Sequence, residues 1–275
     1  MDIKYYLRRM NTLRNMVYFF HQKKEIGRIP KAEFNTSVTR IQALKGAYKG
    51  KRCFVIGNGP SLKAADLDEL KDEYTFATNR IFTIYCKTQW RPTFFCIQDG
   101  DVLKNMLGDL RHVIEQSMYG FVSTKHYLVC KDALKELPNL NWMPMRMIPP
   151  KKNMYKFSAD ITNQVIEGLT VTYSCIQLAA YMGFSEIYLL GVDHNYSVEI
   201  DSDGNIIKHD DHVKNYFDEA AVSINDINLP KVVEMTRAYL SAEKYSRDHG
   251  FRIYNATRGG KLEVFERVNF DTIVE

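Results

Sequence analysis

CFVIGNGPSL, residues 53–62, is the stretch that decides the fold. Its first four residues are apolar and β-prone, and they lead into a turn with two glycines and a proline. The segment from Leu62 to Leu70 then has helical spacing. A strand, a tight turn and a helix in this order predict the opening unit of an α/β domain, whose ligands bind beyond the carboxyl ends of the strands.

Apolar runs and helical segments alternate along the rest of the chain. Buried strands are predicted at 74–79, 93–98, 186–191 and 252–255, with weaker candidates at 120–123 and 146–148. Helices are predicted at 170–182, before the capping Gly183, and from Pro230 to His249, before Gly250. This alternation predicts an α/β fold with a Rossmann-like, mostly parallel sheet and helices on both faces.

Composition supports one globular domain with an appendage. The 275 residues are 45% hydrophobic and 25% charged, which are ordinary globular values and exclude disorder or a disulfide-stapled miniprotein. The five cysteines include no close C-x-x-C pair, so we expect reduced, buried thiols and a cytoplasmic protein. No apolar run is long enough to cross a membrane, and we expect no nucleic-acid partner.

The positive charge gathers at the start of the chain. The first 52 residues carry a net charge of +10, whereas the remainder is acidic. We expect residues 1–50 to form a basic amphipathic helical segment and residues 51–275 to form the Rossmann-like nucleotide-binding catalytic domain. Two kinds of partner for the helix stay open. The first is the inner face of an anionic membrane, with which the protein would associate peripherally. The second is protein, either the chain's own domain or a second subunit in a homo-oligomer.

The glycine turn is the first candidate site. Gly57 and Gly59 let the backbone turn and approach a ligand, while Ser61 and the N–H groups of the next helix can face a phosphate. Leu62 stands where a dinucleotide fingerprint would have its third glycine, and the turn lacks the lysine of a P-loop. A plain strand-to-helix turn is the alternative.

Other polar residues follow strands or begin helices. Asn79 comes after the second strand and can bind a ribose or phosphate. Asp99 and Asp101 come after the third strand and can hold a ribose hydroxyl or magnesium, or merely cap the helix near Val102. Thr170 and Thr172 open a helix that can bind an anion, and Asp193 closes a later strand.

A polar stretch from 193 to 228 predicts a lid-like loop over the active site. It contains His209 and His212, and a histidine is a natural general base at neutral pH. A metal site at these histidines and the aspartates between them, or ordinary solvated loop residues, are the alternatives.

The glycine turn, the segment 170–172 and the run GFSEIYLLGVD at 183–193 resemble two related groups. One is the bacterial family of domains similar to archaeal 6-hydroxymethylpterin diphosphokinase, which includes flagellin-glycosylation proteins. The other is the bacterial sialyltransferases that use CMP-sialic acid. The resemblance spans roughly residues 51–265, and the closing segments at 253–257 and 259–265 are similar to bacterial members of the first group.

This resemblance implies roles for individual residues. Asn58, Gly59, Ser61 and Asn79 would contact a nucleotide, with Thr170 and Thr172 near its base, ribose or phosphate. The chain departs from the sialyltransferases at two positions, having Asp99 in place of a second asparagine and Val171 in place of a serine. Their catalytic histidine lies before the last long helix, where only His209 or His212 can be offered.

Two functions follow as expectations. The first is an inverting glycosyltransferase that joins a nucleotide-activated sugar, CMP-linked nonulosonate by analogy, to a glycan or glycolipid in bacterial surface polysaccharide synthesis. It needs no cofactor, and hydroxyls of Tyr196 or Tyr216 would stabilise the departing phosphate. The second is a diphosphokinase that passes pyrophosphate from ATP to a pterin-like alcohol, with Mg²⁺ on Asp99, Asp101 and Asp193. A catalytically dead nucleotide-binding or scaffolding subunit is a third alternative.

Overall fold

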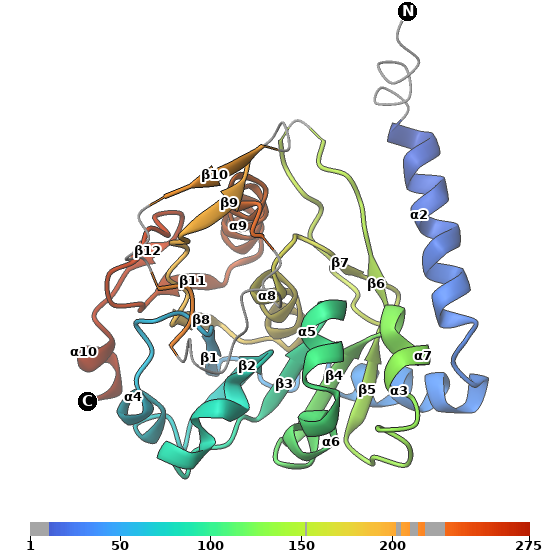
Figure 1. Cartoon of the computed structure of the whole chain (residues 1–275), viewed down its shortest axis with the longest axis horizontal. Coiled ribbons are helices and arrows are strands. Elements are labelled where there is room, and N and C mark those ends of the chain that lie inside the picture. Colours follow the sequence, from blue (N-terminus) through green and yellow to red (C-terminus); the bar gives the residue numbers. More distant parts are fainter. Residues whose placement is uncertain (1–10, 152, 202–204, 210–213, 218–228) are drawn as a thin grey trace, which may run out of the picture.

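The computed structural model describes residues 11–151, 153–201, 205–209, 214–217 and 229–275. Figure 1 shows one central sheet with helices packed around it. Eight strands form this sheet in the order β12-β11-β8-β1-β2-β3-β4-β5, and every neighbouring pair is parallel. The predicted mostly parallel α/β sheet is therefore confirmed.

The strands of the main sheet are short and largely buried. They are β1 (Arg52–Ile56), β2 (Tyr74–Thr78), β3 (Phe94–Ile97), β4 (Tyr119–Ser123), β5 (Leu140–Met143), β8 (Glu186–Leu190), β11 (Arg252–Asn255) and β12 (Glu266–Arg267). Because successive side chains of a strand point to opposite faces, β1 sends Cys53 and Val55 into one core and Phe54 and Ile56 into another.

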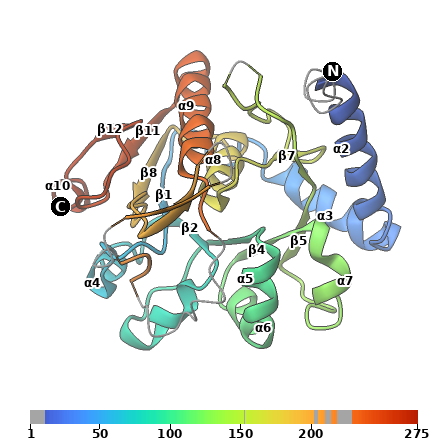
Figure 2. The ribbon, with the colours of Figure 1, turned by 45° about the horizontal axis from the view of Figure 1, so that its top comes forward.

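Helices cover both faces, as predicted. On the face of Val55 lie α8 (Val171–Met182) and α9 (Val232–His249), and α8 contacts β1, β2 and β3. The helical elements of the face of Phe54 are α4 (Ala64–Asp68), η1 (Ile81–Lys87), α5 (Gly100–Asn105), α6 (Leu107–Glu115), η2 (Thr124–His126), α7 (Tyr127–Cys130) and α10 (Phe270–Val274). Figure 2 shows these two layers from above.

The described part of the N-terminal segment, from residue 11 onward, contains two helices rather than one continuous helix. They are α2 (Asn11–Ile26) and α3 (Lys31–Ala43), and Pro30 between them begins α3. A residue before proline avoids helical backbone, which explains why Ile29 interrupts the predicted continuous helix. α3 packs on β5, where the Ser37 hydroxyl accepts a hydrogen bond from the Trp142 backbone N–H. This helix thus joins the main core, although we predicted the segment as an appendage.

The segment after β4 differs from the prediction. The edge strand is β5, whereas the candidate at 146–148 corresponds only to β6 (Met145–Arg146), which pairs with β7 (Val165–Ile166) in a separate small sheet. Pro144 separates β5 from β6. Because proline has no N–H to donate to a neighbouring strand, β5 ends at Met143.

The predicted lid-like stretch contains a hairpin of β9 (Val198–Ile200) and β10 (Ile206–Lys208). Residues 210–213 and 218–228 of this stretch lie outside the described residues. Residues 214–217 contact the loop after β1, because the Phe217 backbone N–H donates a hydrogen bond to the Asn58 carbonyl at 3.0 Å. All five cysteines are free thiols, and four of them are buried.

Candidate functional site

The order in which the strands are added to the sheet reverses direction beside β1. The chain proceeds from β1 outward through β2, β3, β4 and β5, and later returns to place β8 on the other side of β1. At such a switch point the loops after the two strands diverge and leave a crevice at their carboxyl ends. A cavity of about 660 Å³ lies there, lined by residues that follow β1, β2, β3 and β8 and by the starts of α8 and α9.

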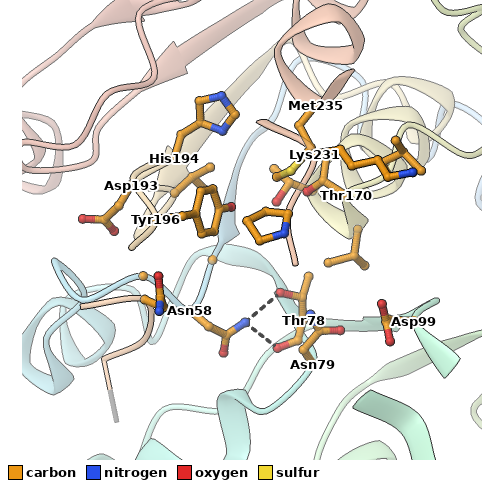
Figure 3. Close-up of a pocket in the computed structure, with 18 of the residues that line it drawn as sticks. Asn58, Thr78, Asn79, Asp99, Thr170, Asp193, His194, Tyr196, Lys231 and Met235 are labelled. Atoms are coloured by element: carbon orange, nitrogen blue, oxygen red, sulfur yellow. Dashed lines mark hydrogen bonds between the residues drawn. The ribbon is translucent and has the colours of Figure 1, made fainter. Parts of the chain in front are cut away.

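Most predicted site residues meet in this cavity, and Figure 3 shows how several of them face it. The lining includes Gly57, Asn58, Gly59, Asn79, Asp99, Thr170, Thr172, Asp193, Tyr196 and Tyr216. Ser61 and His209 are not among the lining residues, and His212 lies outside the described residues. The crevice also contains His194, Lys231 and Tyr239, which the sequence did not single out.

The two glycines of the turn allow the loop after β1 to pack closely against the loop after β8. The Gly57 N–H donates to the Leu190 carbonyl at 2.8 Å, and the Gly59 N–H donates to the Gly191 carbonyl at 2.9 Å. A Cβ on Gly57 would lie 2.3 Å from the Gly191 carbonyl oxygen. These two N–H groups are therefore already used, so an anion must find its donors elsewhere in the cavity.

Those donors lie at the start of α8. Thr170 is the N-cap of this helix but makes no side-chain capping bond, and its hydroxyl lies 3.3 Å from the hydroxyl of Tyr239. The first N–H groups of a helix have no partner within the helix and carry partial positive charge. Because Val171 and Thr172 line the cavity, this helix end can bind a phosphate or carboxylate.

Two asparagine side chains present acceptors. Asn58 Nδ2 donates to the carbonyl and hydroxyl oxygens of Thr78, at 3.0 and 3.1 Å, so its Oδ1 is turned away from them (Figure 3). Asn58 Oδ1 and Asn79 Oδ1 are buried, and neither has a hydrogen-bond partner among the described residues. Asn79 has φ 53°, a left-handed conformation that asparagine tolerates. A ligand with N–H or O–H groups would satisfy both oxygens.

The three predicted aspartates do not form a metal site, although Asp99 and Asp193 line the same cavity. Asp193 Oδ2 accepts from the Ser61 hydroxyl at 2.8 Å, and burial raises the pKa of Asp193 while Ser61 opposes the shift. Asp99 caps α5 by accepting from the N–H groups of Asp101 and Val102. Asp101 pairs with Lys104 on the surface. Within the described ranges, no three His, Cys, Asp or Glu side chains form a group that could hold a metal ion.

His194, next to Asp193 in the loop after β8, is another titratable side chain in the crevice. It is 7% exposed, and the rings of Tyr196 and Tyr239 flank it edge-on. Its Nε2 lies 2.8 Å from the Thr236 hydroxyl, whose single proton is donated to the Val232 carbonyl. With that donation Thr236 can accept from Nε2–H, which would leave the lone pair on Nδ1; this nitrogen is buried without a partner among the described residues.

Burial also keeps this imidazole neutral. It lowers the pKa of His194 to about 4, although Glu199 opposes the shift. In contrast, His209 lies beyond β10, is exposed and pairs with Glu199 at 2.8 Å. Burial raises the pKa of Tyr196 and of Tyr216, so both phenols stay protonated and can donate hydrogen bonds. The cavity lining thus includes a neutral imidazole together with phenols that can donate hydrogen bonds.

A first prediction concerns acid stability. Because the pKa of His194 is lowered on folding, the unfolded chain binds a proton between pH 6.5 and 4 that the folded chain does not. The free energy of unfolding should therefore fall through this range, by about 2 kcal/mol from this group at pH 5. Urea unfolding at pH 7.5 and pH 5 should show this loss in the native protein and a smaller loss in His194→Asn. Equal losses would mean that His194 titrates normally.

Solved structures of other proteins are similar to this chain over most of its length. The MAf glycosyltransferase from Magnetospirillum magneticum AMB-1 is similar over 87% of this chain, with 14% identity and a TM-score of 0.48. This chain spans only 39% of that protein. The sialyltransferase CstII from Campylobacter jejuni, in complex with cytidine-5'-monophosphate, is similar over 80% of this chain and 85% of its own, with 15% identity and a TM-score of 0.48.

A second CstII structure, in complex with CMP-3FNeuAc, covers 79% of this chain and 86% of its own, at 14% identity and a TM-score of 0.48. No curated protein sequence matches the chain. Residues 29–199 match the family described as 6-hydroxymethylpterin diphosphokinase MptE-like, and this match begins just before α3 and ends within β9. Since it covers more than half of the chain, the protein belongs to the 6-hydroxymethylpterin diphosphokinase MptE-like family.

Proposed function

We propose that this chain is a glycosyltransferase that uses a nucleotide-activated sugar. The observation that carries the proposal is His194, an imidazole that burial keeps neutral in the crevice between β1 and β8. Glycosyl transfer needs a base for the acceptor hydroxyl and donors for the departing phosphate. His194 Nδ1 can provide the first, and the open end of α8 can provide the second.

The reaction is a single displacement. The acceptor oxygen attacks the anomeric carbon and gives its proton to His194 Nδ1, while the bond from that carbon to the phosphate oxygen breaks. Attack opposite the leaving group inverts the anomeric centre. We assign the base to His194 in place of His209 and His212, because His209 pairs with Glu199 outside the cavity lining.

The departing phosphate carries the developing negative charge. Val171, Thr172 and Lys231 line the cavity, so the first N–H groups of α8 and the ammonium group of Lys231 can stabilise this charge. The hydroxyls of Tyr196 and Tyr216 can add hydrogen bonds, because burial keeps them protonated. The reaction so described requires no metal cofactor.

The buried oxygens of Asn58 and Asn79 suit the nucleoside, because amino or hydroxyl groups of a base and ribose can donate to them. By analogy with the sialyltransferases, we propose a CMP-linked nonulosonate as the donor. A glycan or glycolipid of bacterial surface polysaccharide would be the acceptor.

The family description favours a second candidate, a diphosphokinase that uses ATP and Mg²⁺. Its metal would need the carboxylates of Asp99, Asp101 and Asp193. These residues do not fit that task, since Asp99 caps α5, Asp101 pairs with Lys104 and Asp193 accepts from Ser61. We therefore place the diphosphokinase second.

A nucleotide thermal-shift screen tests the proposal. We expect CMP, without Mg²⁺, to raise the melting temperature by about 5 °C or more at 100 times its Kd, because a ligand of the folded state alone stabilises it. Asn79→Gly should abolish the shift, since glycine keeps the left-handed backbone and removes only the amide. Asn153→Gly is the matched control, as Asn153 has φ 62° and is not a lining residue.

Other outcomes would change the assignment. UDP, CDP or GDP acting in place of CMP would keep a glycosyltransferase but change its donor. A response to ATP only with Mg²⁺ would favour the diphosphokinase. Absence of any nucleotide response would favour a scaffold.

A further inference from the structure

The helix α2 attaches to the rest of the protein through its polar side. Gln22 is buried and its Nε2 donates to the carbonyls of Pro144 and Asn163, at 3.1 and 3.0 Å. The guanidinium of Arg146 donates to the Asn15 carbonyl at 3.3 Å. Asn15 and Gln22 are seven residues apart and therefore lie on one side of the helix. A surface helix normally buries its apolar side, so α2 is oriented in the opposite way.

The apolar side of α2 is exposed instead. Leu13, Met16, Val17 and Phe20 follow the spacing i, i+3, i+4, i+7 and form one stripe, which we call the α2 stripe. All four are exposed, Met16 at 51% and Phe20 at 62%. Figures 1 and 2 both show α2 at the edge of the molecule, with no other described helix or strand beyond it. A continuous apolar stripe of this kind indicates a docking surface.

Cationic side chains surround the α2 stripe. Arg14 lies on one flank, Lys23 on the other and Lys24 at its end, as the helical spacing dictates, and all three are exposed. Glu25 is the single acidic residue of α2, and Arg28 neutralises it at 2.8 Å. The exposed side of the helix therefore combines apolar groups with unopposed positive charge.

We propose that α2 lies in the interface of an anionic membrane, with the α2 stripe among the acyl chains and the flanking cations near lipid phosphates. Interfacial helices have this combination of an apolar side and a Lys/Arg-rich border. A second copy of the chain is a poorer occupant, because apposing two α2 helices would bring Arg14, Lys23 and Lys24 against their counterparts. No helix of the described residues is long and apolar enough to span a membrane.

Vesicle co-sedimentation of the full chain tests this proposal. We expect binding to vesicles of phosphatidylcholine with one-third phosphatidylglycerol, weak binding to phosphatidylcholine alone, and a loss of binding as salt is raised. Met16→Glu with Phe20→Glu should lower the partition coefficient by at least about tenfold. Both sites are exposed, so the melting temperature should not change.

Met118→Glu with Leu240→Glu is the matched control, because Met118 and Leu240 are equally exposed apolar residues away from α2. This variant should bind within about twofold of the native protein. Equal binding by the α2 variant, or no binding by the native protein, would overturn the proposal. A native dimer that the α2 substitutions dissociate, without vesicle binding, would assign the α2 stripe to a second copy. None of these results depends on nucleotide binding or turnover, so the outcome is independent of the proposed function.

Discussion

Replacing His194 by asparagine is expected to lower kcat by about 10²- to 10⁴-fold, which is the usual contribution of a general base. Asparagine tolerates the left-handed backbone of His194, at φ 51°, but has no basic nitrogen. Asn58 and Asn79, the residues that we propose bind the nucleoside, remain in this variant, so affinity for CMP should stay within a few-fold. Release of CMP from CMP-N-acetylneuraminate, with the thermal shift as the measure of binding, checks both parts.

The histidines of the lid-like stretch provide the control. The double variant His209→Asn with His212→Asn should keep nearly full turnover, because His209 pairs with Glu199 and does not line the cavity. If the double variant loses turnover while His194→Asn keeps it, the base belongs to the lid-like stretch, as the sequence alone suggested. Loss in neither would remove the histidine mechanism.

The second large effect is expected for Gly57→Ala. The new Cβ would lie 2.3 Å from the Gly191 carbonyl oxygen and 2.9 Å from the carbonyl carbon, both backbone atoms. The loops after β1 and β8 cannot easily move apart to make room, because the hydrogen bond from the Gly57 N–H to the Leu190 carbonyl holds them together. We expect the free energy of unfolding to fall by about 3 kcal/mol or more, as for other severe overpacking. Urea unfolding at neutral pH measures this loss.

Gly108→Ala is the matched control for that substitution. Gly108 lies within α6, and a Cβ there would meet nothing within 4 Å. Alanine in a helix is favoured over glycine by about 1 kcal/mol, so this variant should be slightly more stable than the native chain. If Gly57→Ala matched it, the loops after β1 and β8 could not be packed as described.

The sequence predicted the central strands well because each is a short apolar run that ends in a turn. The runs before Gly57, Asn79 and Gly191 became β1, β2 and β8. Prediction was weaker at the margins of the sheet. The edge strand β5 is partly polar and is held by Ser37 of α3, a contact between residues 105 positions apart that no local pattern reveals.

The candidate site was predictable only in part. Residues that follow strands were expected to meet, and Asn58, Asn79 and Asp193 do line one cavity. His194 had the same signal, since it follows Asp193 directly, but its chemistry depends on Thr236, which lies 42 residues further along the chain. Likewise, the sequence could not show that the N–H groups of Gly57 and Gly59 donate to the carbonyls of Leu190 and Gly191, because those carbonyls come from a distant segment.

The position of β8 beside β1 also determines how the chain must fold. Ile56 pairs with Leu190, which leaves the ribosome about 130 residues later, and at 5–20 residues per second this delay is on the order of ten seconds. Until then β1 has one unpaired edge in the middle of a hydrophobic sheet, which makes the nascent chain prone to aggregation. We therefore expect chaperone engagement to concentrate on this interval of synthesis and to end once β8 is inserted.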